Sequence, residues 1–206
     1  MESNETKVSV IINSHNGASY LNNSINSTGL VNLEKSSEIS FSSEVAQIFP
    51  NPNPIGIAYI DDFESRINTV LGSSAYFKID QDQVNKFAEA TEDRQWIHTE
   101  PNRAVRESPF GGAIAHGYLT LSLVPHLWGQ ILEVKNLKMM VNYGIESLRF
   151  NQPVAVGAQV KLHATLKSAI NLRGITKIGV GVQLEIKDVR KPAFSAVLVF
   201  LYHFNT

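Results

Sequence analysis

The sequence contains no cysteine among its 206 residues. This absence excludes disulfides, thiolate metal ligands, cysteine nucleophiles and thiol-based redox chemistry. An excess of charge of one sign is also lacking, because 18 Lys and Arg nearly balance 19 Asp and Glu. A net charge of −1 provides no electrostatic attraction for nucleic acid or for an anionic membrane surface. We therefore expect neither as a partner.

Signals for export and for membrane insertion are missing as well. Glu2 and Glu5 lie near the start of the chain, and no sustained apolar run follows them, unlike a secretory signal or an arginine-rich transit peptide. The most apolar stretch of the chain is interrupted by His116, Pro125 and His126, which argues against a membrane span. We expect a cytoplasmic protein.

Several catalytic motifs are absent. The sequence has no H-E-x-x-H zinc motif and no G-x-S-x-G nucleophile elbow. Its G-x-G, at 179–181, lies inside a strand pattern rather than between a strand and a helix, so it does not indicate a dinucleotide site. Three or four converging ligands would be needed for zinc. We predict neither a metal ion nor another cofactor.

The composition changes along the chain. Residues 1–57 are rich in Asn and Ser, and a Pro-Asn repeat at 50–54 lies near their end. Such a segment cannot bury enough apolar surface to fold alone, and we predict a low-complexity, disordered tail. Residues 58–206 have the apolar periodicity of a single folded domain.

The sequence predicts helices at four places in this domain, one of them a short helix that begins at Thr99-Glu100-Pro101 and ends near Glu107. Another is capped by Asp61-Asp62 and ends at Gly72, and a third is capped by Asp80 or Asp82. A longer helix is predicted from Ala115 to Leu132. It is apolar on nearly every face, which is typical of a buried helix.

Strict alternation predicts strands at 74–79, 143–150, 160–167, 176–186 and 194–204. In strand 160–167 we expect His163 and Thr165 on a solvent-exposed face. The predicted fold class is α+β, a curled antiparallel sheet wrapped around the long central helix. The open edges of such a sheet favour pairing with a second copy of the chain.

Asp93 and His98 are the first candidates for chemistry. Five residues apart, they would diverge by about 140° on one continuous helix, whereas a turn after Asp93 can bring them together. A carboxylate and an imidazole that share one water can perform acid–base catalysis near neutral pH. A helix-capping Asp beside a surface His is the alternative interpretation.

The start of the long helix is the second candidate. Free backbone N–H groups at a helix start suit a developing oxyanion, and Gly117 allows a carbonyl group to approach the backbone closely. A glycine that merely packs against the sheet explains the same pattern. His116 beside it is more typical of a satisfied core histidine than of a ligand or catalyst.

Taken together, these segments resemble the MaoC-like (R)-specific enoyl-CoA hydratase family, in the branch related to nodulation protein N. The resemblance covers residues 58–204. It rests on ATEDRQWIH at 90–98, FGGAIAHG at 110–117, VNYG at 141–144, RF at 149–150 and PV at 153–154.

The resemblance implies a single hot-dog domain, a homodimer, and a hydro-lyase without metal or redox cofactor. The implied reaction is reversible hydration of trans-2-enoyl-CoA to (R)-3-hydroxyacyl-CoA. Asp93 and His98 match the catalytic pair that activates water, and the Gly117 amide matches the donor to the thioester oxygen. We expect five further residues to contact substrate: Trp96, His116, Tyr118, Asn142 and Tyr143. Trp128 is a further aromatic candidate for lining the acyl tunnel, and core packing is the commoner use of each of these aromatic residues when taken singly.

Three positions depart from the family pattern. Glu92 stands where glycine is usual, and Arg94 stands where this branch commonly has histidine. Pro125 occupies the region where some members carry a serine, so no third catalytic side chain is assigned. If Glu92 and Asp93 were both poorly solvated, their repulsion would raise the pKa values of the pair.

Other functions remain open at this stage. An acyl carrier protein could replace CoA as the thioester carrier, which would make the chain a 3-hydroxyacyl-carrier-protein dehydratase. A non-catalytic acyl-CoA-binding hot-dog module and a thioesterase are the alternatives of other classes. The acyl chain length and the metabolic pathway are not encoded in any pattern that we recognise.

Overall fold

The computed structural model describes residues 55–57 and 60–205. Its elements are β1 (Ile55–Ile57), α2 (Ile60–Glu64), β2 (Val70–Ser73), β3 (Phe77–Lys78), α3 (Gln81–Thr91), α4 (Trp96–Thr99), α5 (Pro101–Glu107), α6 (Gly117–Ser122), α7 (Val124–Trp128), β4 (Leu132–Val134), β5 (Leu137–Phe150), β6 (Gln159–Leu172), β7 (Ile175–Ile186) and β8 (Val189–Phe204). None of these helices is long and apolar enough to cross a membrane.

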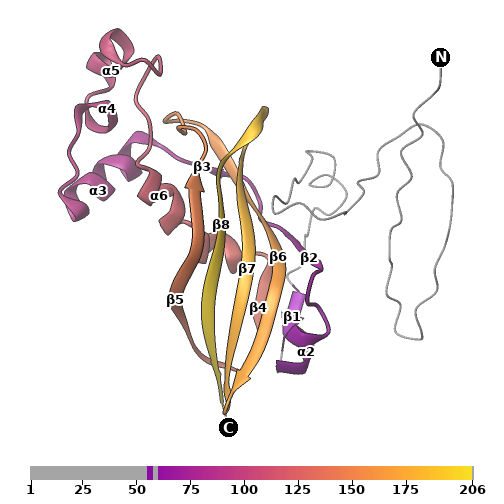
Figure 1. The fold of residues 1–206 in the computed structure, drawn as a ribbon. Helices are drawn as coiled ribbons and strands as arrows, with labels where there is room; N and C mark the ends of the chain where they lie inside the picture. Colours follow the sequence, from indigo (N-terminus) through magenta and orange to yellow (C-terminus); the bar gives the residue numbers. More distant parts are fainter. Residues whose placement is uncertain (1–54, 58–59, 206) are drawn as a thin grey trace, which may run out of the picture. The chain divides into compact units, whose positions relative to one another are not determined.

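A six-stranded antiparallel sheet forms the body of the domain. Its strands run in the order β2-β6-β7-β8-β5, and β3 pairs with the start of β6. The long strands curl together, as Figure 1 shows, while α3, α4 and α5 lie near one end of β5. The predicted α+β class and the curled antiparallel sheet are therefore confirmed. Left-handed or positive-φ residues close the turns, with Gly157 at 92° and Gly174 at 93°.

A second, parallel pairing was not predicted. β1 pairs with β4, so that Ile55 lies opposite Leu132 and Ile57 opposite Val134. Ile57 is fully buried. These three residues fall at the end of the range predicted as a tail, and residues 1–54 of that range lie outside the described part of the chain.

The predicted long helix from Ala115 to Leu132 is wrong in its length and continuity. The Ala115 amide donates to the Val154 carbonyl at 2.8 Å instead of entering a helix, and the helix begins only at Gly117. It is divided into α6 and α7 near Leu123, because Pro125 has no amide hydrogen and is tolerated only in the first turn of the second segment. Leu132 already belongs to β4.

The two short helices still fill the inside of the curl. Leu119 and Leu127 pack in one buried cluster with Leu162 and Leu198 of the sheet. Trp128, an alternative candidate for the acyl tunnel, is 2% exposed and donates to the Tyr202 hydroxyl at 2.7 Å. Trp128 therefore belongs to the core, as the packing alternative predicted.

The helix predicted between Asp61 and Gly72 is also wrong in its length, because only its first turn is present. α2 ends at Glu64, Asn68 adopts a positive φ of 63°, and Val70–Ser73 form a strand on β6. The apolar residues matched a helical period, but pairing with β6 satisfies the backbone and buries Leu71 equally well. Of the predicted strand 74–79, Phe77–Lys78 remain.

His163 and Thr165 do not lie on a wet face, contrary to the prediction. They are 4% and 6% exposed. His163 Nδ1 lies 2.7 Å from Ser73 Oγ and Nε2 lies 2.6 Å from a Glu185 oxygen, so polar partners on β2 and β7 replace water. Alternation alone could not reveal that both faces of β6 are covered here.

Candidate active site

The chain changes direction immediately before Asp93. Asp80 caps α3 as predicted, and the helix ends at Thr91. Glu92 then adopts a left-handed conformation with φ of 60°, and the Arg94 amide donates to its carbonyl at 3.1 Å. The predicted turn is therefore present, and it begins one residue earlier than predicted. It places Asp93 beside α4, which carries His98.

His98 is held as a neutral base. It is 6% exposed, and its Nδ1 donates to the Ile114 carbonyl at 2.7 Å. Because a carbonyl only accepts, Nδ1 carries a proton, and in the neutral ring Nε2 keeps its lone pair. Burial lowers the pKa of His98 from its ordinary value of 6.5; the bond to Ile114 and the charge of Asp93 oppose this, and His116 adds to it.

Asp93 is half-buried and is oriented by a neighbour. The Gln95 amide donates to Asp93 Oδ1 at 3.1 Å, which leaves the other carboxylate oxygen for a water or substrate. Glu92 is exposed and paired with Arg94 at 3.1 Å. The repulsion considered from the sequence requires both Glu92 and Asp93 to be poorly solvated. Glu92 is exposed to solvent, so that condition is not met.

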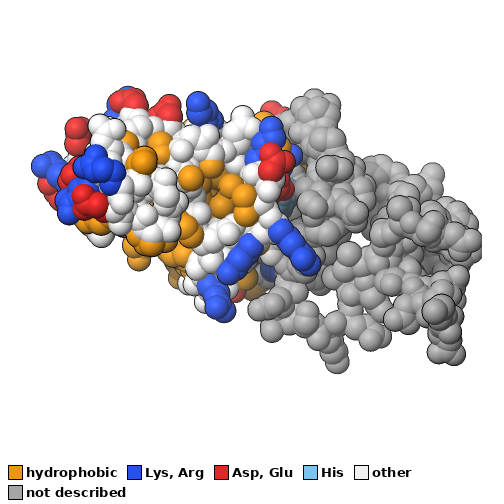
Figure 2. Space-filling view, turned by 90° about the horizontal axis from the view of Figure 1, so that it is seen from above, with side chains coloured by type: hydrophobic (Ala, Val, Ile, Leu, Met, Phe, Trp, Pro, Cys, Tyr) orange, Lys and Arg blue, Asp and Glu red, His pale blue; other side chains and the backbone are white. Residues whose placement is uncertain are grey.

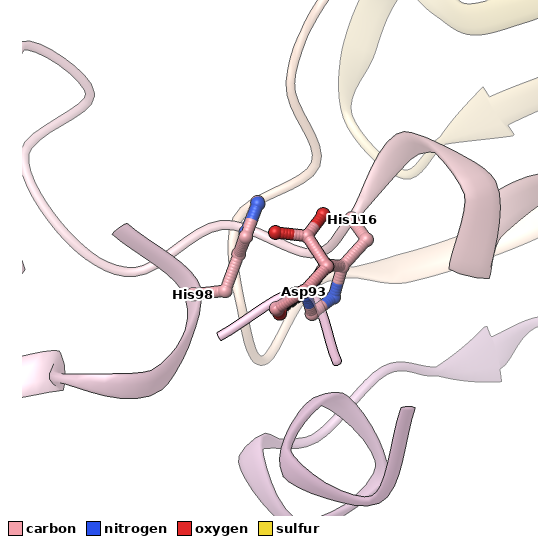
Figure 3. Close-up of side chains that lie close together, drawn as sticks. All are labelled: Asp93, His98 and His116. Carbon is pink, nitrogen blue, oxygen red and sulfur yellow. Dashed lines mark hydrogen bonds between the residues drawn. The ribbon is translucent and has the colours of Figure 1, made fainter. Parts of the chain in front are cut away.

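Figure 3 shows Asp93, His98 and His116 gathered at one point. Each offers a potential ligand atom, and these atoms lie within 4.8 Å of one another. Sequence spacing had given no sign of such a set. However, the rings of His98 and His116 stack with centroids 3.8 Å apart and planes 29° apart. A metal ion lies close to the plane of each imidazole that binds it. The planes of two stacked rings do not meet close to the rings, so this arrangement does not suit one metal ion bound by both histidines.

A pocket of about 350 Å³ opens beside these groups. His98, Gly117 and Thr120 line one part of it, and Phe150 with residues 151–154 lines another. The pocket thus joins the helix start to the loop after β5. A Cβ atom on Gly117 would lie 3.2 Å from the Phe150 ring, so only glycine leaves this wall undisturbed.

Two predicted catalytic residues, His98 and Gly117, line the pocket, and Asp93 lies beside His98, whereas four of the predicted substrate-binding residues lie outside the pocket. Tyr118 is 68% exposed, with its ring 5.8 Å from Phe150, and Trp96 is half-buried beneath the Arg103 guanidinium. Asn142 and Tyr143 lie on the exposed strand β5. None of these four lines the described pocket. A contact with substrate stays a prediction for each of them.

Sequence reasoning missed part of the pocket wall. Asn151 and Gln152 line it, as does Thr120 inside α6. The signal was available, because the matching blocks at 149–150 and 153–154 flank the first two residues. These two blocks support the family resemblance, but the pattern by itself does not predict that the residues between them line a pocket.

The positive and negative side chains near the site are mixed. In Figure 2, Lys and Arg alternate with Asp and Glu over the end of the domain that carries α3, α4 and α5. Ion pairs account for several of them, for example Lys86 with Asp82 at 2.6 Å and Arg103 with Glu107 at 2.8 Å. No field of one sign covers this end of the described residues.

Comparison with known proteins identifies the family. Residues 62–187 match the model of the MaoC-like domain. The chain belongs to this family. The predicted family and its hot-dog fold are confirmed, and as a member of a hydratase and dehydratase family the chain is an enzyme of the hydro-lyase class.

Curated relatives cover most of the described domain. The 3-hydroxyacyl-thioester dehydratase Z of Mycobacterium tuberculosis is 38% identical over 144 residues, which is 69% of this chain and 95% of the relative. Nodulation protein N of Rhizobium meliloti is 38% identical over 148 residues, 71% of this chain and 92% of the relative.

Solved structures show the same fold. An (R)-hydratase from A. caviae involved in PHA biosynthesis aligns with a TM-score of 0.53 and 25% identity, over 64% of this chain and 94% of that one. A monoamine oxidase regulatory protein from Archaeoglobus aligns with a TM-score of 0.60 and 20% identity, over 75% and 99%.

Proposed function

We propose that this MaoC-like protein is an (R)-specific enoyl-CoA hydratase, which adds water reversibly to trans-2-enoyl-CoA to form (R)-3-hydroxyacyl-CoA. The observation that carries the proposal is the arrangement of three residues: a carboxylate oxygen of Asp93 lies within 4.8 Å of a ring nitrogen of His98, and His98 and Gly117 line one pocket. Two curated relatives are named for dehydration of 3-hydroxyacyl thioesters and of 3-hydroxybutyryl-CoA, the reverse direction of the same reaction.

The geometry supports a division of work between the two side chains. Asp93 and His98 hold one water, and the lone pair on His98 Nε2 accepts a proton as the water oxygen bonds to the β-carbon. One member of the pair then passes a proton to the α-carbon, so the elements of water add across the double bond. The thioester bond stays intact throughout.

Gly117 serves the negative charge that develops on the thioester oxygen. It is the first residue of α6, so its amide has no partner within the helix, and it lines the pocket. A donor aimed at a developing oxyanion typically contributes about 100-fold or more in rate. The absent side chain lets the thioester reach this amide.

A second copy of the chain is part of the proposal. β5 is an edge strand with one side unpaired in the described sheet, and it is exposed along most of its length. Met139, Tyr143 and Ile145 on it are 47%, 62% and 50% exposed. An open apolar edge invites pairing with another strand, and a second β5 provides one in an isologous homodimer.

The homodimer is tested by measuring the molar mass in solution with multi-angle light scattering. The parent is expected at twice the chain mass. Ile145→Lys places a charge on the open edge and is expected to give a monomer, while Lys78→Glu on β3, which is exposed and pairs with β6 rather than with β5, serves as a charge-change control. A monomeric parent would contradict the homodimer without touching the reaction.

The reaction itself is tested with purified full chain and a series from crotonyl-CoA to dodecenoyl-CoA. Loss of the enoyl absorbance measures hydration, and chiral chromatography of the product gives its configuration. Asp93→Asn and His98→Gln are expected to stay folded by circular dichroism and to lose hydration by several orders of magnitude. Near-parental turnover in either variant would overturn the assignment.

Two further arms separate the alternatives. The same acyl groups on an acyl carrier protein show whether the carrier is preferred to CoA, in which case the enzyme is a carrier-protein dehydratase. A free-thiol assay detects thioester cleavage, which hydration does not cause. Binding of acyl-CoA without hydration at any chain length would indicate a non-catalytic module.

A further inference from the structure

His116 has no role in the hydration chemistry described above, although it lies among the groups that perform it. It immediately precedes Gly117 in the chain and is 2% exposed. It does not line the pocket. A buried imidazole behind a catalytic pair can act only through its neighbours, so its contacts decide what it does.

One contact is with the backbone of Asp93. His116 Nε2 lies 2.9 Å from the Asp93 carbonyl oxygen, and because the carbonyl only accepts, the nitrogen is the donor. Asp93 follows the left-handed Glu92 in a loop of four residues between α3 and α4. This bond therefore fastens a short connecting loop to the start of α6.

The second contact is with the ring of His98, on which the His116 ring stacks at 3.8 Å. The Phe87 ring of α3 lies 5.0 Å away and contacts the same imidazole. His116 thus packs against α3 and α4 at once. Its Nδ1 has no hydrogen-bond partner among the described residues, so the bond to Asp93 is the polar contact that orients the ring.

We propose that His116 is a positioning residue, which holds the backbone of Asp93 and the ring of His98 in register with the amide of Gly117. Its main chain is joined to Gly117, its Nε2 binds Asp93 and its ring face supports His98. This role replaces the substrate contact expected for it from the sequence. The kinetic consequence rests on the proposed function.

Two substitutions separate the hydrogen bond from the stacking. His116→Gln keeps an amide donor at about the reach of Nε2, whereas His116→Phe keeps a flat ring on His98 and removes the donor. His126→Phe is the matched control, since His126 is exposed on α7 and outside the pocket. All three are compared with the parent in crotonyl-CoA hydration and in thermal unfolding.

The expected result is a split between the two kinetic constants. A misplaced catalytic group lowers kcat without weakening binding, so His116→Phe should lose about 10- to 100-fold in kcat with KM within about twofold. His116→Gln should keep kcat within about threefold of the parent, and the control should equal the parent. A raised KM with unchanged kcat in the Phe variant would overturn the proposal and restore the substrate contact.

Hydrogen exchange of the peptide that contains residues 92–95 gives a readout that needs no activity. The loop should exchange faster in His116→Phe than in the parent and in His116→Gln. Parental exchange in a folded Phe variant would overturn the positioning role even if the chain hydrates no thioester. Should the Phe variant not fold, the folded Gln variant decides, because a tenfold loss of kcat in it contradicts the proposal and parental kcat supports it.

Discussion

The ring of Phe150 lies 3.2 Å from the position that a Cβ atom on Gly117 would occupy. The two residues come from different parts of the domain, the end of β5 and the start of α6, and both line the pocket. Contacts this short are tighter than ordinary van der Waals packing. The wall of the site therefore depends on a glycine at this position for space as well as for access to its amide.

We expect Gly117→Val to abolish hydration while the fold survives. The new side chain would displace Phe150 and shield the amide, which costs about 100-fold or more in rate. Gly112→Val is a matched control, because no atom lies within 4 Å of its added Cβ. Initial rates with crotonyl-CoA and circular dichroism measure both effects. Parental activity in the Gly117 variant would refute the role of this amide.

The pH dependence should follow His98. Burial lowers its pKa below 6.5, and catalysis needs the neutral ring. As pH falls, kcat/KM should therefore stay level through 6.5 and decline only below it, where the free enzyme protonates His98. Rates from pH 5 to 8 test this, with an NMR titration of the His98 ring for assignment. A decline centred at or above 6.5 would contradict the prediction.

Folding stability should respond to the same lowered pKa in a defined direction. The unfolded chain protonates this histidine at about 6.5, whereas the native ring stays neutral to lower pH. The unfolded state thus binds more protons as pH drops below 6.5, and stability falls there. His163 adds to the effect, since burial lowers its pKa too. Urea unfolding at pH 7.5 and 5.5 measures the change, and equal stability at both would count against it.

Gln95 should matter for turnover although it is exposed. Its amide donates to Asp93 Oδ1 at 3.1 Å, and a hydrogen bond to a charged group typically contributes about 1.5–3 kcal/mol. We expect Gln95→Leu to lower kcat about tenfold with little change in KM, because the carboxylate loses one of its restraints. Steady-state kinetics decide the matter. Parental kcat would show that Asp93 needs no such partner.

Glu92→Gly should stabilise the protein. Glu92 holds a φ of 60°, which L side chains adopt at a cost, and its ion pair with Arg94 is largely exposed and contributes little. A left-handed backbone costs an L residue about 1–2 kcal/mol, and the larger entropy of glycine in the unfolded chain offsets about 0.4–1 kcal/mol of this. We expect a net gain of about 0.5–1 kcal/mol in the free energy of unfolding. Chemical denaturation measures it, with Glu89→Gly in the regular helix α3 expected to lose stability instead. Loss of stability in the Glu92 variant would show that the pair outweighs the strain.

Much of the local structure follows from the amino-acid sequence. The cap at Asp80, the helix behind it and the alternating strands depend on interactions between residues close in the chain or on a simple period of burial. The residues of the candidate site, Asp93, His98 and Gly117, were also identified by their chemistry and by resemblance. Such features are readable because the information for them is local.

The residues that pack against each of these elements are set by the tertiary fold. Alternation predicted that the His163 side chain faces solvent, but the side chain is buried and contacts Ser73 and Glu185 of the neighbouring strands. The 115–132 pattern predicted one helix, and the pairing of Ala115 with Val154 shortened it. The sequence predicts a substrate contact for His116, whose ring in the structure is buried and stacks on that of His98. In each case the residue that makes the contact is distant in sequence. The apolar periodicity of a segment carries no information about which distant residue packs against it.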